Sequence, residues 1–491
     1  MSICLAAQPA GAAPRVDDLR WLTRVSYGIN PSSVEQMARQ GRRKFLAAQL
    51  MPATPATGLP APIRAQIDAM EVSRRSGADL LAEVQAGQQR IRELPEDQRA
   101  AAQQQLNQRG NALGAEAVRR ELLRAVYSPL QLQEQLAWFW ANHFSIHQGK
   151  ANVRWLLADY MDQAIRPHML GRFRDLVLAT LTHPAMLQYL DNAQNAAGRL
   201  NENYARELLE LHTLGVDGGY EQQDVQELAR VLTGAGVAAG PDPPKLKPEW
   251  QPLYRRAGGF EFNPARHDFG AKQLLGAPVA GQGFSEIEQA VDRIVAQPAC
   301  ARFVSTRLAM YFVSDEPPTA LVERMASTFT RSGGDLRAVL VTMLESREFA
   351  ASLGHKFKDP MHFVIGSLRL AYDGRPISNT QPIVNWLGSL GEPLFGRATP
   401  DGYPLIQSAW GSSGQMSRRF EMARAIGSGN AGLFQSDSGT VAPGFPQLAN
   451  RLYFDTVETT LSEQTRTALG NAASQTEWNT LLLASPELNY R

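Results

Sequence analysis

The sequence lacks any long hydrophobic run and contains almost no cysteine. No stretch of about 18 consecutive apolar residues, the length that predicts a membrane-spanning helix, occurs in the chain. Apolar segments such as Leu176 to Leu181 are interrupted within two turns, so we expect no membrane span. The two cysteines, Cys4 and Cys300, are too few to build a disulfide framework and leave the redox compartment open.

The chain also lacks an excess of charge of either sign. Its 49 Lys and Arg residues balance 48 Asp and Glu residues. Binding to a phosphate backbone needs clustered positive charge, so we expect no nucleic-acid partner. Three motifs are missing as well: the Gly-x-Ser-x-Gly elbow, the phosphate-binding loop that ends in Gly-Lys-Ser/Thr, and the Cys-x-x-Cys pair. We therefore expect no cofactor and leave a bound metal open.

Alternation of period two is scarce, whereas helix starts recur along the chain. Alternation is confined to short pieces such as Gly259 to Asn263. Helix starts, in which a capping residue precedes proline, occur at Ser128-Pro129, His183-Pro184 and Asp359-Pro360. The sequence therefore predicts an all-α fold, a multi-helix orthogonal bundle with at most a small β-hairpin.

Composition shifts suggest how the chain is organised. Residues 1–18 contain Gly11-Ala12-Ala13, which is typical of a cleavage region, and we interpret them as a leader remnant or a disordered N-terminus. We interpret residues 19–491 as a single large helical domain. Within it, residues 63–119 predict a protruding helical hairpin that turns at Leu94-Pro95-Glu96, because proline ends the preceding helix. Residues 391–414, rich in proline and glycine, are interpreted as a functional loop.

Five segments resemble, in order, the successive blocks of one bacterial family. They are Arg119 to Phe144, Gly171 to Asn192, Leu200 to Val216, His267 to Gly276 and Thr399 to Pro404. From about Leu19 to about Leu433 the chain resembles the family catalogued as domain of unknown function 1800. The resemblance implies an all-helical bacterial protein that is commonly exported, so we expect a periplasmic or secreted location. It implies no established reaction.

The first candidate site is the segment Asn201 to His212, a predicted helix. Five of its polar residues share an arc of about 140° on one face; they are Glu202, Asn203, Arg206, Glu207 and Glu210. One interpretation is a solvated face with a Glu202 to Arg206 ion pair. The other is catalysis: two carboxylates one turn apart, one kept ionised by arginine and one holding a proton, provide the acid and base that hydrolyse a glycosidic bond.

The second candidate lies on the helix that carries Trp140, Asn142 and His143. Aromatic faces stack on sugar rings, and a neighbouring amide and imidazole orient hydroxyls or move a proton. The alternative is that the rings form core and that His143 bonds a carbonyl. His147 follows His143 by four residues, a spacing found in metal sites, but no Glu stands between them as it does in zinc proteases. We therefore predict no metal ligand.

Two further candidates lie outside the helices. His267-Asp268, with Lys272 downstream, forms a segment that either carries function or makes a structural salt bridge or cap. Thr399 to Pro404 has the residues of a tight turn. It either serves as that turn or forms a pocket rim that displays Asp401, Tyr403 and the nearby Trp410.

These candidates support two hypotheses. The first is a secreted or periplasmic hydrolase, a glycosidase acting on a polysaccharide or another cell-envelope polymer. Its expected catalytic residues are Glu202, Glu207, Glu210 and Asp268, assisted by His143 and His267. Its expected substrate-binding residues are Asn142, Trp140, Asn203, Arg206, Lys272, Asp401, Tyr403 and Trp410. The second is a non-catalytic cell-surface binding or assembly protein, in which the same groups form a buried polar network that fixes helix packing.

Overall fold

The fold is predominantly helical, as the sequence predicts. The computed structural model describes residues 16–51, 58–240, 242–436, 439–440 and 445–491. The expected leader up to residue 15, with Cys4, lies outside the described residues. None of the helices in the described part of the chain combines the length and the apolar character needed to cross a bilayer.

The helices follow one another closely along the chain. The first group is α1 (Val16–Arg24), α2 (Pro31–Gln40), α3 (Arg42–Gln49), α4 (Ala61–Ala69), α5 (Gly77–Glu93), α6 (Glu96–Tyr127) and α7 (Gln131–His143). The second is α8 (Leu157–Asp159), α9 (Phe173–Leu181), α10 (Pro184–Tyr189), α11 (Asn203–Glu207), α12 (Gln222–Val231), α13 (Phe284–Val295), α14 (Pro298–Phe312), α15 (Thr319–Arg331), α16 (Leu336–Leu344) and α17 (Arg347–Ala351). The third is α18 (Pro360–Ala371), α19 (Gln381–Ser389), α20 (Ser413–Gly427), α21 (Glu463–Gly470) and α22 (Gln475–Ala484).

Strands are short and all pair antiparallel. Three form a sheet in the order β1-β3-β2, and the other four form two hairpins, β4-β5 and β6-β7. Their bounds are β1 Ala235–Val237, β2 Arg255–Ala257, β3 Phe260–Phe262, β4 Lys272–Leu274, β5 Ala277–Val279, β6 Gln435–Ser436 and β7 Gly439–Thr440. The strand content thus slightly exceeds the single hairpin expected, because three-residue strands leave little alternation in the sequence.

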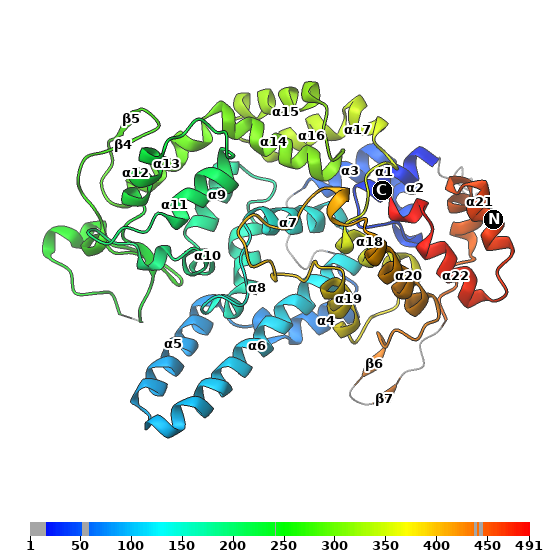
Figure 1. The fold of residues 1–491 in the computed structure, drawn as a ribbon, viewed down its shortest axis with the longest axis horizontal. Helices are drawn as coiled ribbons and strands as arrows, with labels where there is room; N and C mark the ends of the chain where they lie inside the picture. The colour runs from blue at the N-terminus through cyan, green and yellow to red at the C-terminus, as the bar shows by residue number, and fades with distance from the viewer. Residues whose placement is uncertain (1–15, 52–57, 241, 437–438, 441–444) are drawn as a thin grey trace, which may run out of the picture.

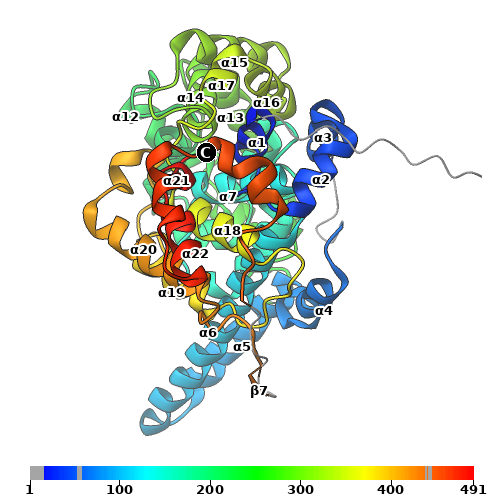
Figure 2. The same ribbon diagram turned by 90° about the vertical axis from the view of Figure 1, so that its right-hand side faces the viewer.

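Helix α7 lies in the middle of the molecule (Figure 1). The helices from α9 to α13 lie on one side of it and those from α18 to α22 on the other. The hairpin of α5 and α6 projects from the body in both views (Figures 1 and 2). It turns between Glu93 and Glu96, where proline was expected to end the first helix.

Capping explains where several helices begin. The side chain of Asp359 accepts from the amide of His362, and that of His183 accepts from the amide of Ala185, as the two proline-containing starts predict. The predicted cap at Ser128 is wrong. Its hydroxyl accepts from the amide of Leu130 in a local turn, and α7 begins only at Gln131.

Every residue of α7 is buried, including its polar ones. Buried polar groups need hydrogen-bond partners, and distant segments supply them. The amide oxygen of Gln135 accepts from the guanidinium of Arg491 at 3.0 Å, while its amide nitrogen donates to the carbonyl of Arg24 at 3.4 Å. The Arg491 guanidinium also lies 2.6 Å from Nε2 of His362 on α18. One glutamine on α7 therefore ties α1 and α18 to the last residues of the chain.

A second buried cluster joins α7 to α6. The guanidinium of Arg166 lies 2.8 Å from the carboxylate of Glu134 on α7 and also pairs with Glu121 on α6. Burial raises the pKa of Glu121, but Arg166 and Arg120 outweigh that effect and bring it down to about 2. Glu121 is therefore charged in the interior, and both carboxylates share the guanidinium of Arg166.

We predict that Arg166→Met lowers the free energy of unfolding by about 3–5 kcal/mol, because it leaves two buried carboxylates without their shared cation. Urea denaturation followed by circular dichroism measures the change. Arg39→Met is the matched control, since Arg39 pairs with Glu35 at 3.0 Å on an exposed face, where such a pair contributes about 0–1 kcal/mol. Equal effects of the two substitutions would contradict the structural role of the cluster.

Candidate functional site

The helix predicted at Asn201 to His212 is divided in two. Residues Asn203–Glu207 form α11, and Leu208–Thr213 continue as a π-helix, labelled η5. The amide of Leu214 donates to the carbonyl of Leu209 five residues earlier, at 2.8 Å. The wider turn changes the angle between successive side chains, so the single arc expected for a regular α-helix does not extend to Glu210. Such π-turns frequently occur at functional sites.

The side chains of Glu207 and Glu210 have no ion-pair or hydrogen-bond partner in the described part of the chain. Their neighbours are paired: Glu202 lies 3.2 Å from Arg206, and the same carboxylate accepts from Gln222 at 2.8 Å. Both unpaired side chains are partly exposed. They are therefore available to a ligand, whereas Glu202 and Arg206 engage each other.

The loop between α19 and α20 brings a third carboxylate to this place. Asn142 of α7 fixes the loop with two hydrogen bonds: its amide nitrogen donates to the carbonyl of Tyr403 at 3.0 Å, and its amide oxygen accepts from the Tyr403 amide at 2.6 Å. Gly402 has φ of 71°, and a Cβ there would lie 2.2 Å from the carbonyl oxygen of Asn142. Glycine is thus required. Asp401 precedes it and lies near Glu207.

The carboxyl groups of Glu207 and Asp401 are shifted in opposite directions. Burial raises the pKa of Glu207, and the charges of Glu210 and Asp401 add to the effect against the opposing charge of Arg206. Burial also raises the pKa of Asp401, but hydrogen bonds from Arg397 and Thr399 outweigh it and leave that pKa below its usual value. The Arg397 guanidinium contacts both carboxylate oxygens, at 3.1 and 2.7 Å. The environment therefore separates the pKa values of the two carboxyl groups, raising that of Glu207 and lowering that of Asp401.

Three residues near these carboxylates carried no signal in the sequence. Burial raises the pKa of Tyr189, at the end of α10, and the charges of Glu207 and Asp401 raise it further. Burial and the charge of Glu210 raise the pKa of Tyr220. Tyr189 and Arg397 lie within or just before segments that resemble family blocks, but nothing in their local pattern distinguishes them. Only the fold brings them to Glu207.

The aromatic helix α7 does not present its rings to solvent. Trp140 is 1% exposed and packs against Phe139, Phe144 and Phe173, so it is core and cannot stack on a sugar. His143 is also buried, and its Nε2 lies 2.9 Å from the carbonyl of His212. Burial lowers the pKa of His143, and the nearby charge of Arg307 lowers it further, so the ring is neutral at neutral pH.

The possible histidine pair on α7 does not form. The helix ends at His143, so His147 lies beyond it and not one turn along the same face. In the described ranges no group of three or more His, Cys, Asp or Glu side chains is placed to hold a metal ion. Two of the residues expected at a pocket rim, Tyr403 and Trp410, are also buried. Tyr403 stacks on Trp138, and the Trp410 indole donates to the carbonyl of Pro404 at 2.9 Å.

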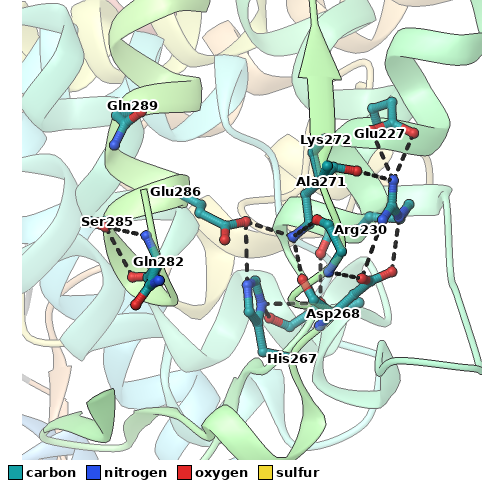
Figure 3. A network of polar contacts seen from close by, with 12 residues as sticks. Glu227, Arg230, His267, Asp268, Ala271, Lys272, Gln282, Ser285, Glu286 and Gln289 are labelled. Carbon is teal, nitrogen blue, oxygen red and sulfur yellow. Dashed lines mark hydrogen bonds and ion pairs between the residues drawn. The ribbon is translucent and has the colours of Figure 1, made fainter. Parts of the chain in front are cut away.

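The side chains of His267, Asp268 and Lys272 are engaged by neighbouring residues of the fold (Figure 3). The Nδ1 of His267 lies 2.7 Å from the carbonyl of Thr233, and its Nε2 lies 3.3 Å from the carboxylate of Glu286. The same carboxylate lies 2.8 Å from the Lys272 ammonium. Asp268 pairs with Arg230 at 2.8 Å. These contacts match the structural salt bridge that was the alternative interpretation.

The remaining predicted residue, Asn203, hydrogen-bonds to the backbone after α10 and has no hydrogen bond to Glu207 or Glu210. Its side-chain amide donates to the carbonyl of Leu190 at 3.2 Å. The structure therefore brings Glu207 within range of the charges of Glu210 and Asp401, and Asn142 positions the loop that carries Asp401. His267, Asp268 and Lys272 are engaged by other partners, and Trp140, His143 and Trp410 are buried.

We predict that Glu286→Gln lowers the free energy of unfolding by about 3–5 kcal/mol, because the buried Lys272 ammonium loses its counter-charge. Thermal or urea unfolding measures the loss. Glu288→Gln on the same helix is the control, since no ion pair involves Glu288 among the described residues, and we expect a change within about 0.5 kcal/mol. A Glu286→Gln protein as stable as the control would show that the network of Figure 3 does not support the fold.

Comparison with known proteins gives one match. A family model described as "Protein of unknown function (DUF1800)" matches residues 20–490. No curated protein and no solved structure matches the chain. The match extends past Leu433, where the resemblance seen in the sequence ended, and includes the residues that pack against α1 and α18. Because it covers nearly the whole chain, this protein belongs to the DUF1800 family.

Proposed function

We propose that this protein is a secreted or periplasmic hydrolase that cleaves glycosidic bonds in a polysaccharide, with its site at Glu207, Glu210 and Asp401. The observation that supports the proposal is the pair of partly exposed carboxylates, Glu207 and Glu210, without a partner in the described part of the chain, next to an Asp401 held by Arg397. The carboxylates of Glu134, Asp268 and Glu286, in contrast, are ion-paired.

The chemistry follows from the opposite pKa shifts. Glu207, whose pKa is raised, acts as the general acid and gives its proton to the oxygen of the leaving sugar. Asp401, whose pKa is lowered, stays ionised and either takes a proton from water or stabilises the positive charge that develops on the sugar ring. The ring of Tyr220, which is partly exposed beside Glu210, provides an apolar face for a sugar, a role that the buried Trp140 and Tyr189 cannot fill.

A second candidate function, a non-catalytic binding or assembly protein, is favoured by a different observation. The group of His267, Lys272 and Glu286 is the buried polar network that this hypothesis expects. This hypothesis leaves the carboxylates of Glu207 and Glu210 unexplained, because a network that fixes packing would pair them. We therefore rank hydrolysis first.

We predict that Glu207→Gln reduces hydrolysis of the preferred polysaccharide by about 10²–10⁴-fold, since the general acid is lost. The melting temperature should barely change, because Glu207 has no ion-pair partner to lose among the described residues. Release of reducing ends from a panel of bacterial and plant polysaccharides identifies the substrate and measures the rate. Differential scanning fluorimetry follows the melting temperature of each variant.

Glu202→Gln is the control for this experiment, since Glu202 lies beside the same helix but is paired with Arg206. It should retain activity within a few-fold. If the wild-type protein binds polysaccharides of the panel but releases no products, the result would support the assembly role and contradict the hydrolase proposal. Equal losses of activity in the two variants would remove Glu207 from the mechanism.

The pH profile gives an independent prediction. Activity should fall as the pH rises through the pKa of Glu207, which then loses its proton, and should fall at low pH as Asp401 becomes protonated. Arg397→Met removes the hydrogen bonds that keep the pKa of Asp401 low, so the acid limb should move to higher pH while the alkaline limb stays in place. Initial rates across the pH range test this, and an unmoved acid limb would show that Asp401 is not the ionised group.

A further inference from the structure

A partly open cavity is lined by residues other than the three carboxylates. This cavity, of about 350 Å³, is bounded by α1, by α18 and by the segments around residues 353–358 and 486–491. Its walls are mainly apolar, with Leu19, Ile29, Leu370 and Leu488 among them. Its volume is within the range of small-molecule sites, and an apolar cavity of about 150 Å³ already accommodates benzene. A six-carbon chain therefore fits.

One charged side chain in this wall lacks the partner that its burial demands. Three lysines are buried in the described part of the chain: Lys272 and Lys356, each 3% exposed, and Lys358, 7% exposed. Lys272 pairs with Glu286, and Lys356 pairs with Asp315. Lys358 lines the cavity, and within the described ranges no carboxylate lies within ion-pair distance of it.

The groups that hydrogen-bond to Lys358 are backbone carbonyls and the guanidinium of Arg419. Its ammonium group donates to the carbonyl of Leu488 at 2.8 Å, which uses one of three possible donors. Its own amide donates to the carbonyl of Asn489 at 2.9 Å, and its carbonyl accepts from the guanidinium of Arg419 at 2.7 Å. The neighbouring carboxylate of Asp359 is engaged by His362 at 2.8 Å. The side chain is thus held at the cavity wall without neutralisation.

We propose that Lys358 is a nucleophilic amine, and that the cavity binds an aldehyde or ketone with an apolar chain, which the amine captures as an imine. The amine nitrogen attacks the carbonyl carbon, the nitrogen gives up its two protons, and the carbonyl oxygen leaves as water. The apolar walls hold the chain of the ligand, and no oxidant or reductant takes part. This site is independent of the proposed hydrolase.

The electrostatics of the cavity favour the neutral amine that this reaction needs. Burial lowers the pKa of Lys358 to about 7, with further lowering by the charges of Arg419 and Arg491 and opposition from Asp359. A lysine amine becomes a nucleophile when it is desolvated or placed beside other cations. At pH 7 an ordinary lysine, with a pKa near 10.4, is neutral in fewer than about one molecule in a thousand. Lys358 differs from an ordinary lysine because its pKa is lowered and because it lines a cavity that can hold a ligand.

Reductive trapping of the intact protein tests the proposal. Hexanal and sodium cyanoborohydride are added at pH 7, and the adduct at each of the seven lysines is measured by peptide mass spectrometry. We expect Lys358 to be modified at least tenfold faster than the exposed Lys245 and Lys247, and 1-hexanol, which has the same chain but no carbonyl, to slow Lys358 alone. Modification of Lys358 at the rate of the exposed lysines, or indifference to 1-hexanol, would overturn the proposal.

A variant that fills the cavity provides the matched control. Leu370 is a partly exposed residue of the cavity wall, so Leu370→Trp obstructs the space without removing the amine. Trapping at Lys358 should fall at least tenfold while Lys245 and Lys247 react as before, and circular dichroism should show an unchanged fold. Unchanged trapping in a folded Leu370→Trp protein would show that the cavity is not the binding site. If this variant does not fold, the competition by 1-hexanol decides the question on the wild-type protein.

Discussion

The structure depends on the complete burial of α7, a helix that carries polar side chains on every face. An ordinary core helix would be apolar throughout, because each buried polar group must find a partner. Here the partners come from the whole chain: Gln135 joins Arg24 and Arg491, Glu134 meets Arg166, and Asn142 holds the backbone of Tyr403. A buried hydrogen-bonded network of this kind fixes which surfaces of the surrounding helices face inward.

The candidate hydrolytic site is a consequence of the same arrangement. Asn142 belongs to the core, yet its two hydrogen bonds set the position of the loop that presents Asp401. Gly402 permits the close approach, since any side chain there would collide with the carbonyl of Asn142. Glu207 comes from a different helix, at the start of the π-helical turn. The carboxylates are therefore positioned by rigid elements, although one of them lies on a loop.

The sequence predicted local features well and long-range pairings poorly. Helical starts at His183 and Asp359 and the turn of the hairpin at Pro95 follow from capping and proline chemistry, which act over a few residues. The sequence left open whether the aromatic residues of α7 bind a ligand or form core, because local sequence cannot show that a helix is buried all round. The π-turn and the approach of Asp401 to Glu207 depend on tertiary contacts, so no local pattern predicts them. For the same reason the sequence did not decide whether His267 and Lys272 form a structural salt bridge, and it did not indicate Glu286 as their partner.

The partnership of Gln135 with Arg491 spans 356 residues of sequence, and this separation affects how the chain folds. At a translation rate of about 5–20 residues per second, roughly 20–70 s pass between the synthesis of the two residues. The full set of hydrogen-bond partners of Gln135 is therefore available only after the segment that carries Arg491 has been synthesised.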